Sequence, residues 1–246
     1  MAKKTTSKKS GKTAPARTPA SGGRLLRWFR RWALRIVLVP VTLVIVLVLL
    51  FSLVNPPITL TMWQEHGKYG RLERSWMPLD DIAPVMARSV VAAEDANFCL
   101  HWGFDVTAIR AALEDGGARG GSTISQQVVK NVFLWQGRSW TRKALETLIT
   151  PLVEIFWSKR RILEVYLNVA ETGEGVFGVE AAAQRAFGVP AAKLSARQAA
   201  LIAAILPAPR SRSAAKPSDR VSRRARAIAD GAATIRADGR AACFED

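Results

Sequence analysis

Two adjacent carboxylates, Glu94 and Asp95, end an apolar helical stretch and are followed by aromatic residues and His101. Because neighbouring residues of a helix point about 100° apart, these carboxylates face different surroundings. One can face a cleft while the other braces the next turn. A carboxylate beside apolar walls has a raised pKa and could act as a general acid or base near neutral pH. For a Glu-Asp pair considered alone, a solvated helix end is the alternative.

A second polar window begins at Gly120–Thr123, where two glycines and Ser-Thr indicate a loop that turns into a helix. The free N–H groups of such a helix start, with the following Lys130, suit an anion such as a pyrophosphate. Arg138 and Arg142 follow shortly after. The alternative is a capped helix start with ordinary surface polar residues.

Helical periodicity dominates the elements that must hold these residues, from about residue 61 to residue 206. The predicted helices begin near Asp80 and Ser139 and span Arg160–Ala170, Val179–Phe187 and Ala196–Ile205. Alternating strand patterns are not convincing, although one or two short strands could escape detection. The fold is therefore expected to be mostly α.

Five motifs occur in order within residues 60–210. They are AAEDANFCLHWG (92–103), GGSTISQQVVKN (120–131), RKALE (142–146), SKRRILEVYLN (158–168) and GVFGVEAAAQRAFG (175–188). In order and spacing they resemble the family 51 glycosyltransferases, the peptidoglycan transglycosylases. One motif alone would be weak, but five in order are specific. The resemblance implies a lysozyme-like helical domain. The sequence contains no S-x-N and K-T-G motifs of a transpeptidase domain, and in this it resembles the monofunctional members of the family.

The resemblance implies that a lipid-linked glycan strand is joined to lipid II with inversion and release of undecaprenyl pyrophosphate. Glu94 matches the base that deprotonates the acceptor hydroxyl, and Glu146 matches a second catalytic carboxylate. The pyrophosphate-binding positions are Lys130 and Arg138, with support from Ser122, Gln126 and Arg142. Asp95, His101 and Asn168 are interpreted as structural braces.

Glu146 is expected to hold the donor or acceptor side, with a divalent cation (Mg²⁺ or Mn²⁺) as one way of doing so. The alternative is that Glu146 is an i, i+4 partner of Arg142, and the two roles are compatible. No dedicated metal site or other cofactor is expected, since the chain has only two histidines and two cysteines. Cys99 and Cys243 could pair, but their spacing does not indicate a disulfide framework. Leu145 stands directly before Glu146, where some family members have Lys. The sequence alone therefore does not show which residue supplies the cationic contact that this Lys makes in those members.

Two other functions remain as alternatives. A lysozyme-like enzyme that cleaves glycan strands would need an acidic proton donor and no pyrophosphate site. A non-catalytic scaffold for cell-wall assembly would not need both Glu94 and Glu146. The expected partners are lipid II, the lipid-linked strand, the membrane and, as a further expectation, cell-wall synthesis or division proteins.

The net charge of +16 is concentrated in the tails. Residues 1–35 carry eleven basic residues and no acid, and nine basic against five acidic residues follow from Arg210 onward. The middle of the chain is thus close to neutral, which argues against a nucleic-acid partner. We expect a basic tail over 1–35, a transmembrane anchor over 36–54, a glycosyltransferase domain over 60–210 and a basic C-terminal tail over 211–246.

The run Ile36–Val54 holds nineteen residues without a charge, about the length that crosses a bilayer core. A cleaved signal peptide is the alternative, but its apolar region is usually shorter and precedes a small-x-small site. The positive-inside rule puts the N-terminus in the cytoplasm and the domain in the periplasm, on a single-pass inner-membrane protein.

We therefore predict that a reporter fused after Asp246 lies outside the cytoplasm and that the mature protein keeps its N-terminus. Protease accessibility of the reporter and mass spectrometry of the purified protein check both points. Cleavage near Val54, or a cytoplasmic reporter, would contradict the anchor.

Overall fold

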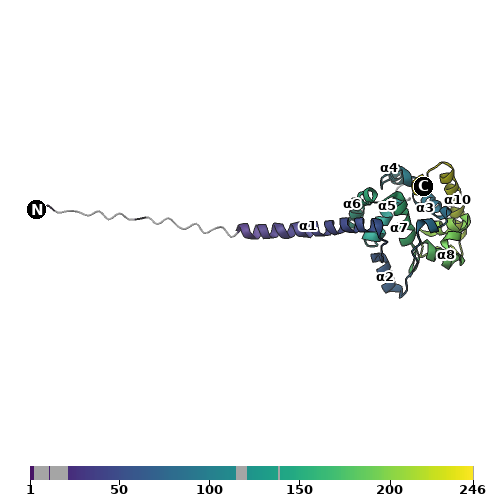
Figure 1. The fold of residues 1–246 in the computed structure, drawn as a ribbon, viewed down its shortest axis with the longest axis horizontal. Helices are drawn as coiled ribbons and strands as arrows, with labels where there is room; N and C mark the ends of the chain where they lie inside the picture. Colours follow the sequence, from purple (N-terminus) through teal and green to yellow (C-terminus); the bar gives the residue numbers. More distant parts are fainter. Residues whose placement is uncertain (3–10, 12–21, 115–120, 138, 246) are drawn as a thin grey trace. The chain divides into compact units, whose positions relative to one another are not determined.

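The computed structural model of the chain describes residues 1–2, 11, 22–114, 121–137 and 139–245. The described part is mostly helical, as predicted (Figure 1). The helices are α1 (Gly22–Leu53), α2 (Leu60–Tyr69), α3 (Pro84–Glu94), α4 (Val106–Glu114), α5 (Ile124–Phe133), α6 (Trp140–Phe156), α7 (Lys159–Val169), α8 (Val179–Phe187), α9 (Ala196–Ile205), α10 (Asp219–Ala237) and α11 (Ala242–Glu245). Short 3₁₀ turns lie at Leu79–Asp81, Phe98–Leu100 and Ala191–Lys193.

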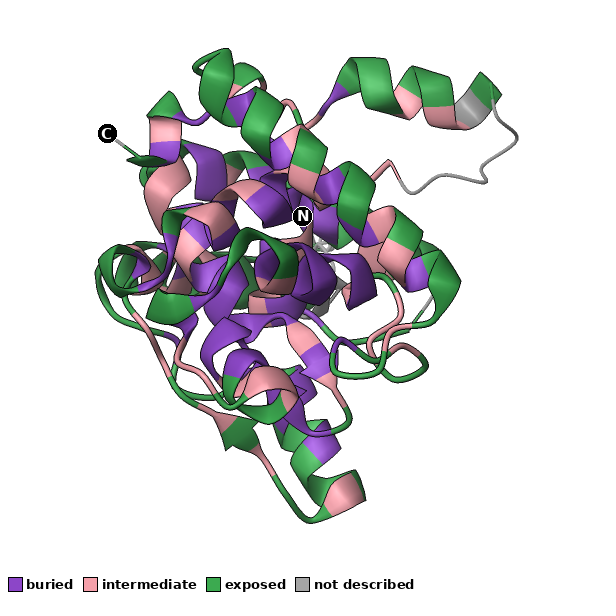
Figure 2. Ribbon diagram, turned by 90° about the vertical axis from the view of Figure 1, so that its right-hand side faces the viewer, coloured by how far each residue is buried: buried purple, intermediate pink, exposed green. Residues whose placement is uncertain are grey.

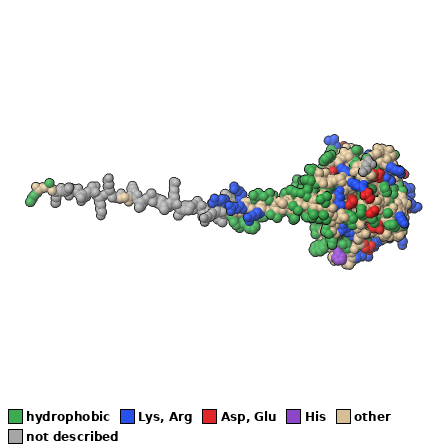
Figure 3. Space-filling view, viewed as in Figure 1, with side chains coloured by type: hydrophobic (Ala, Val, Ile, Leu, Met, Phe, Trp, Pro, Cys, Tyr) green, Lys and Arg blue, Asp and Glu red, His purple; other side chains and the backbone are tan. Residues whose placement is uncertain are grey.

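The N-terminal helix α1 carries the apolar segment. Its part Arg27–Leu53 contains an 18-residue stretch with a mean hydropathy of 3.2 and is long and apolar enough to cross a membrane. Basic side chains gather at the start of the described helix and apolar ones follow along it (Figure 3). The chain divides into two compact units, Met1–Leu43 and Val44–Asp246. The second unit therefore includes the last turns of α1.

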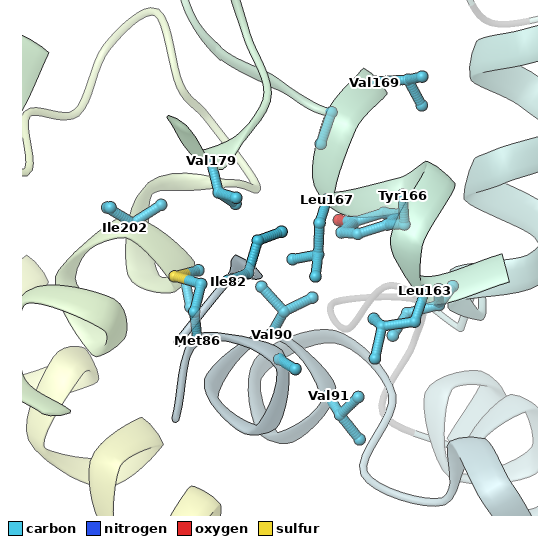
Figure 4. Close-up of a cluster of buried hydrophobic side chains, with 14 of the residues drawn as sticks. Ile82, Met86, Val90, Val91, Leu163, Tyr166, Leu167, Val169, Val179 and Ile202 are labelled. Atoms are coloured by element: carbon cyan, nitrogen blue, oxygen red, sulfur yellow. The ribbon is translucent and has the colours of Figure 1, made fainter. Parts of the chain in front are cut away.

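Within the second unit, two groups of helices build the core. Helices α3, α9 and α10 pack on one another, and α5 packs on α6 and α7. Buried residues lie along the inner sides of these helices (Figure 2). In Figure 4, the side chains of Val90 and Val91 on α3 lie near those of Leu163 and Leu167 on α7, and all four are buried. One continuous apolar core thus holds α3, which ends at Glu94, and the helices that follow.

Side-chain caps fix where several helices begin. Thr123 caps α5 and Ser195 caps α9, each in a reciprocal capping box with the third residue of its helix. The helices predicted over Val179–Phe187 and Ala196–Ile205 have these bounds in the structure. The helix predicted near Ser139 begins at Trp140, with Ser139 as its cap.

The helix predicted to open near Asp80 begins later, at Pro84. Leu79–Asp81 form only a 3₁₀ turn, and Ala83 has ψ 125°, outside the helical region. A proline disfavours helical geometry in the residue before it but suits the first position of a helix. Pro84 therefore separates the turn from α3.

Three short strands form one sheet that the sequence pattern did not reveal. The strands β1 (Glu73–Arg74), β2 (Glu171–Gly173) and β3 (Val176–Phe177) lie in the order β1-β3-β2. β1 is parallel to β3, and β2 is antiparallel to it. Strands of two or three residues are too short to show an alternating pattern.

Residues 211–246, which we expected to be a basic tail, contain α10 and α11. The buried residues of α10 recur every three or four positions: Val221, Ala225, Ile228, Ala232 and Ile235. A Cβ placed on Gly231 would lie 3.3 Å from the Cβ of Ala92 on α3, so glycine permits the close approach of these helices. The domain boundaries stay a prediction, while these contacts tie the end of the chain to the helix that carries Glu94.

The two cysteines form a disulfide, Cys99–Cys243, across a sequence separation of 144 residues. Cys99 lies in the 3₁₀ turn Phe98–Leu100, shortly after Glu94, and Cys243 lies in α11. The disulfide therefore covalently attaches the C-terminal helix to the segment that follows α3.

We predict that the double variant Cys99→Ala/Cys243→Ala loses roughly 2–5 kcal/mol of unfolding free energy, because the crosslink closes a long loop in the unfolded chain. Thermal unfolding of the detergent-solubilised protein, with and without a thiol reductant, measures the effect. Reductant should lower the midpoint of the wild type to that of the variant and leave the variant unchanged. Equal midpoints for wild type and variant without reductant would contradict the prediction.

Candidate active site

The site begins where α3 ends, at the buried side chain of Asp95. Its Oδ1 lies 2.8 Å from His101 Nε2, and its Oδ2 accepts a hydrogen bond from the Ile124 backbone N–H at 2.9 Å. Ile124 is the first residue of α5, where unpaired N–H groups and the helix dipole favour a carboxylate. Asp95 thus joins the end of α3 to the start of α5, in keeping with the predicted bracing role.

Two further contacts fix the segment between α3 and α4. The Thr123 hydroxyl donates to the Gly103 carbonyl at 2.7 Å, and Lys159 Nζ donates to the His101 carbonyl at 2.7 Å. Gly103 has φ +84°, and a Cβ there would come within 2.6 Å of Thr150 Cγ2 on α6. Glycine is therefore required for the loop to lie against α6.

Glu94, the last residue of α3, has a different environment from that of Asp95. Its side chain is 12% exposed, and Gln127 Nε2 donates to its Oε2 at 2.9 Å. Its Oε1 is buried and has no hydrogen-bond partner among the described residues. The Arg224 guanidinium on α10 lies 3.9 Å from this oxygen.

Burial raises the pKa of Glu94, while the Gln127 hydrogen bond and the charges of Arg224 and Lys130 offset part of the rise. A carboxylate with a raised pKa and one unbonded oxygen is suited to accept a proton near neutral pH. The geometry therefore fits a general base, the role predicted for this residue.

Lys130, on α5, has no hydrogen-bond partner within the described part of the chain. Burial lowers the pKa of its ammonium group and is the largest effect. The negative charge of Glu146, and to a smaller extent that of Glu94, raises this pKa. The positive charges of Arg142 and Lys143 act in the opposite direction. Lys130 thus lies in the field of both predicted catalytic carboxylates, with its hydrogen-bonding capacity unused by the described residues.

Glu146, on α6, is buried and is bound by two cations. Arg142 donates to its Oε2 at 2.6 Å, and Lys143 Nζ donates to its Oε1. Lys143 also donates to the Ser122 hydroxyl at 3.0 Å. The i, i+4 pair with Arg142 is therefore present, and Lys143 supplies a cation although position 145 is Leu.

The described residues contain no group of three or more His, Cys, Asp or Glu side chains that could hold a metal ion. Both oxygens of Glu146 already accept bonds from Arg142 and Lys143. The positive charges of Arg142 and Lys143 beside this carboxylate oppose a divalent cation there, so the donor set does not fit one.

Gln126 is directed inward rather than toward a cleft. Its side-chain oxygen accepts the Thr123 backbone N–H at 3.1 Å in the capping box of α5, and the residue is buried. A substrate contact by Gln126 stays a prediction. Arg138 lies outside the described residues, so its role stays a prediction as well.

Two cavities lie beside these residues. One of about 360 Å³ is lined by Glu94, Asn97 and Ser122, among others. Another of about 340 Å³ is lined by Ser139, Trp140, Arg142 and Lys143. The predicted base and the predicted loop residue Ser122 therefore share one cavity, and the Arg142 cation borders the second.

Three side chains near Glu94 were not singled out in the sequence. Gln127 contacts Glu94 directly, Tyr166 donates to Gln127 at 3.2 Å, and Arg224 approaches Glu94 from α10. Gln127 stands in the GGSTISQQVVKN motif and could have been noticed there. Tyr166 has the pattern of a core residue, and Arg224 is 130 positions from Glu94, so no local pattern links them to the site.

A half-buried carboxylate with a raised pKa, electrostatically coupled to a half-buried lysine in a helical domain, fits an enzyme that transfers a group from an anionic leaving group. The family model described as Transglycosylase matches residues 62–233, and the chain belongs to that family. It is 64% identical over 225 residues to the biosynthetic peptidoglycan transglycosylase of Jannaschia sp. (strain CCS1), covering 91% of this chain and 94% of that protein. It is also 46% identical over 226 residues to the protein of that name from Caulobacter vibrioides, covering 90% and 99%.

We predict that Lys130→Ala lowers kcat more than it raises KM, because an unpaired cation acts on charge that develops in the transition state. A lost contact of this kind costs about 2.7–4 kcal/mol. Steady-state polymerisation across lipid II concentrations measures both constants, with Lys193→Ala, an exposed lysine, as the control. An unchanged kcat with a raised KM would assign Lys130 to uniform substrate binding instead.

Proposed function

We propose that the protein polymerises lipid II into linear glycan strands and releases undecaprenyl pyrophosphate. Glu94 accepts the proton of the acceptor hydroxyl as that oxygen bonds to the anomeric carbon of the lipid-linked donor. The bond between this carbon and the pyrophosphate oxygen breaks, and its electron pair leaves with the pyrophosphate. Because attack and departure are on opposite faces, the product is a β-1,4 bond formed with inversion.

The observation that carries the proposal is the state of the Glu94 carboxylate. One oxygen is held by Gln127, whereas Oε1 is buried and has no hydrogen-bond partner in the described part of the chain. An unsatisfied buried carboxylate oxygen is costly, so it indicates a site kept for a reacting group. Glu94 also lines a cavity of about 360 Å³, in which we place the acceptor sugar.

The leaving group requires cations rather than a proton donor, since its charge develops without protonation. Lys130 is the best candidate, because it has no hydrogen bond to the described residues and is electrostatically coupled to Glu94. Arg142 borders a separate cavity, and Ser122 is held by Lys143. We assign Lys130, Arg138 and Arg142 to the pyrophosphate, with Ser122 in support, and Glu146 to holding the cations in place.

We further propose that the domain lies in the periplasm, at the outer face of the inner membrane. The Cys99–Cys243 disulfide supports an oxidising compartment. Exposed apolar side chains on α6, which include Trp140, Leu148 and Ile155, support a position close to lipid. Trp63, on α2, is also exposed, whereas the neighbouring Met62 belongs to the core.

Glycan hydrolysis is the less favoured reaction. A raised pKa of Glu94 would also suit a general acid, but hydrolysis gives no role to Lys130, which is coupled to Glu94 and has no hydrogen bond to the described residues. A non-catalytic scaffold would have no reason to keep the Glu94 carboxylate buried and partly unsatisfied.

We predict that Glu94→Gln abolishes polymerisation without unfolding the protein, because Gln has nearly the same shape but cannot accept the proton. The expected loss is roughly 10²–10⁴-fold. Turnover of labelled lipid II by the folded variant measures it, with Glu174→Gln, an exposed carboxylate, as the control.

In the same assay, the wild-type rate should fall as pH drops through a pKa above the ordinary glutamate value, because the base must be ionised and burial raises its pKa.

For the substitution, near-normal turnover by folded Glu94→Gln would remove Glu94 from the mechanism.

A further inference from the structure

Three side chains from three helices form a hydrogen-bonded chain that ends at the base. The Tyr166 hydroxyl, on α7, donates to Gln127 Oε1 at 3.2 Å, and Gln127 Nε2, on α5, donates to Glu94 Oε2 at 2.9 Å. Tyr166 touches neither cavity beside the site, so it acts only through Gln127.

The phenol of Tyr166 is held in place by the core. The residue is 2% exposed, and its ring lies beside Leu163 and Leu167 in Figure 4. Burial raises the pKa of Tyr166 well above its ordinary value, and the nearby charges of Glu94 and Asp95 act in the same direction. The hydroxyl therefore keeps its proton near neutral pH and is available as a donor.

That donor decides how the Gln127 amide is oriented. An amide has an accepting oxygen and a donating NH₂ group, and a half-turn exchanges the two. With Oε1 bound to the Tyr166 hydroxyl, the NH₂ group faces Glu94. The opposite orientation would direct the amide oxygen at the carboxylate, so that two acceptors would face each other.

We propose that Tyr166 and Gln127 are positioning residues, which hold Glu94 Oε2 so that Oε1 is left as the oxygen that receives the acceptor proton. The inference rests on the proposed role of Glu94 as the base. The arrangement distinguishes the two oxygens: Oε2 is bonded to Gln127, whereas Oε1 is buried and has no hydrogen bond to the described residues.

The proposal gives both residues a pH-dependent signature. The Gln127 hydrogen bond favours the ionised form of Glu94, together with the charges of Arg224 and Lys130, while the like charge of Asp95 opposes it. Removing the bond should therefore make the carboxylate easier to protonate. The acid limb of the kcat–pH profile should move to higher pH, by about one unit for a lost bond to a charged group.

The test compares Tyr166→Phe, Gln127→Met and the double variant by kcat for lipid II polymerisation across pH. Tyr166→Phe removes only the hydroxyl, and Gln127→Met removes the amide at similar length. Both single variants should move the acid limb upward, with Gln127→Met moving it at least as far. The double variant should move it no further than Gln127→Met, because Tyr166 acts through Gln127.

Matched controls are Tyr69→Phe, the other tyrosine of the chain, and Gln184→Met, which removes a Gln–Glu bond of the same kind on α8. Both should keep the wild-type acid limb. Rates that fall equally at every pH in Tyr166→Phe and Gln127→Met would show a merely structural role and overturn the proposal. Should Tyr166→Phe fail to fold, as judged by its thermal midpoint, the half-buried Gln127→Met decides the outcome alone.

Glu94→Gln in the same assay separates the two failures. An inactive Glu94→Gln protein with unmoved acid limbs in the positioning variants overturns the positioning inference and leaves the base in place. An active Glu94→Gln protein overturns the role of Glu94 as the base, and the positioning inference with it.

Discussion

The buried carboxylate of Asp95 determines where the site can form. Its two oxygens are taken by His101 and by the first N–H of α5, so the end of α3 and the start of α5 are fixed to each other. Because the carboxylate lies at a helix N-terminus, its charge is stabilised where it is buried. Glu94 precedes it by one residue, so its position follows from the same contact.

The two adjacent carboxylates differ in what surrounds them rather than in chemistry. Asp95 has both oxygens satisfied, whereas Glu94 has one oxygen bonded to Gln127 and one left buried without a partner in the described residues. Burial raises the pKa of Glu94 because too few donors compensate the lost hydration. The protein thereby places a fully bonded brace and the proposed base side by side.

The cations are arranged around a second carboxylate on α6. Glu146 binds Arg142 and Lys143, and Lys143 reaches across to Ser122, so the loop before α5 is tied to α6. Lys130 remains without a hydrogen bond within the described part of the chain. The paired cations tie these segments together, and Lys130 is a cation of the described residues that we assign to the leaving anion.

The sequence by itself determined the mostly helical fold, the apolar anchor and the motifs that carry Glu94, Lys130 and Glu146, because helical periodicity and short motifs are local properties of the chain. It missed the strands, which are too short for a pattern, and it placed the start of α3 before Pro84. Only the tertiary structure decided that Gln126 caps a helix while its neighbour Gln127 contacts Glu94. Only the tertiary structure places Tyr166 against Gln127 and Arg224 near Glu94, and only it pairs Cys99 with Cys243. These contacts join residues far apart in the chain, and packing of the helices, which no local pattern encodes, sets which side chains meet.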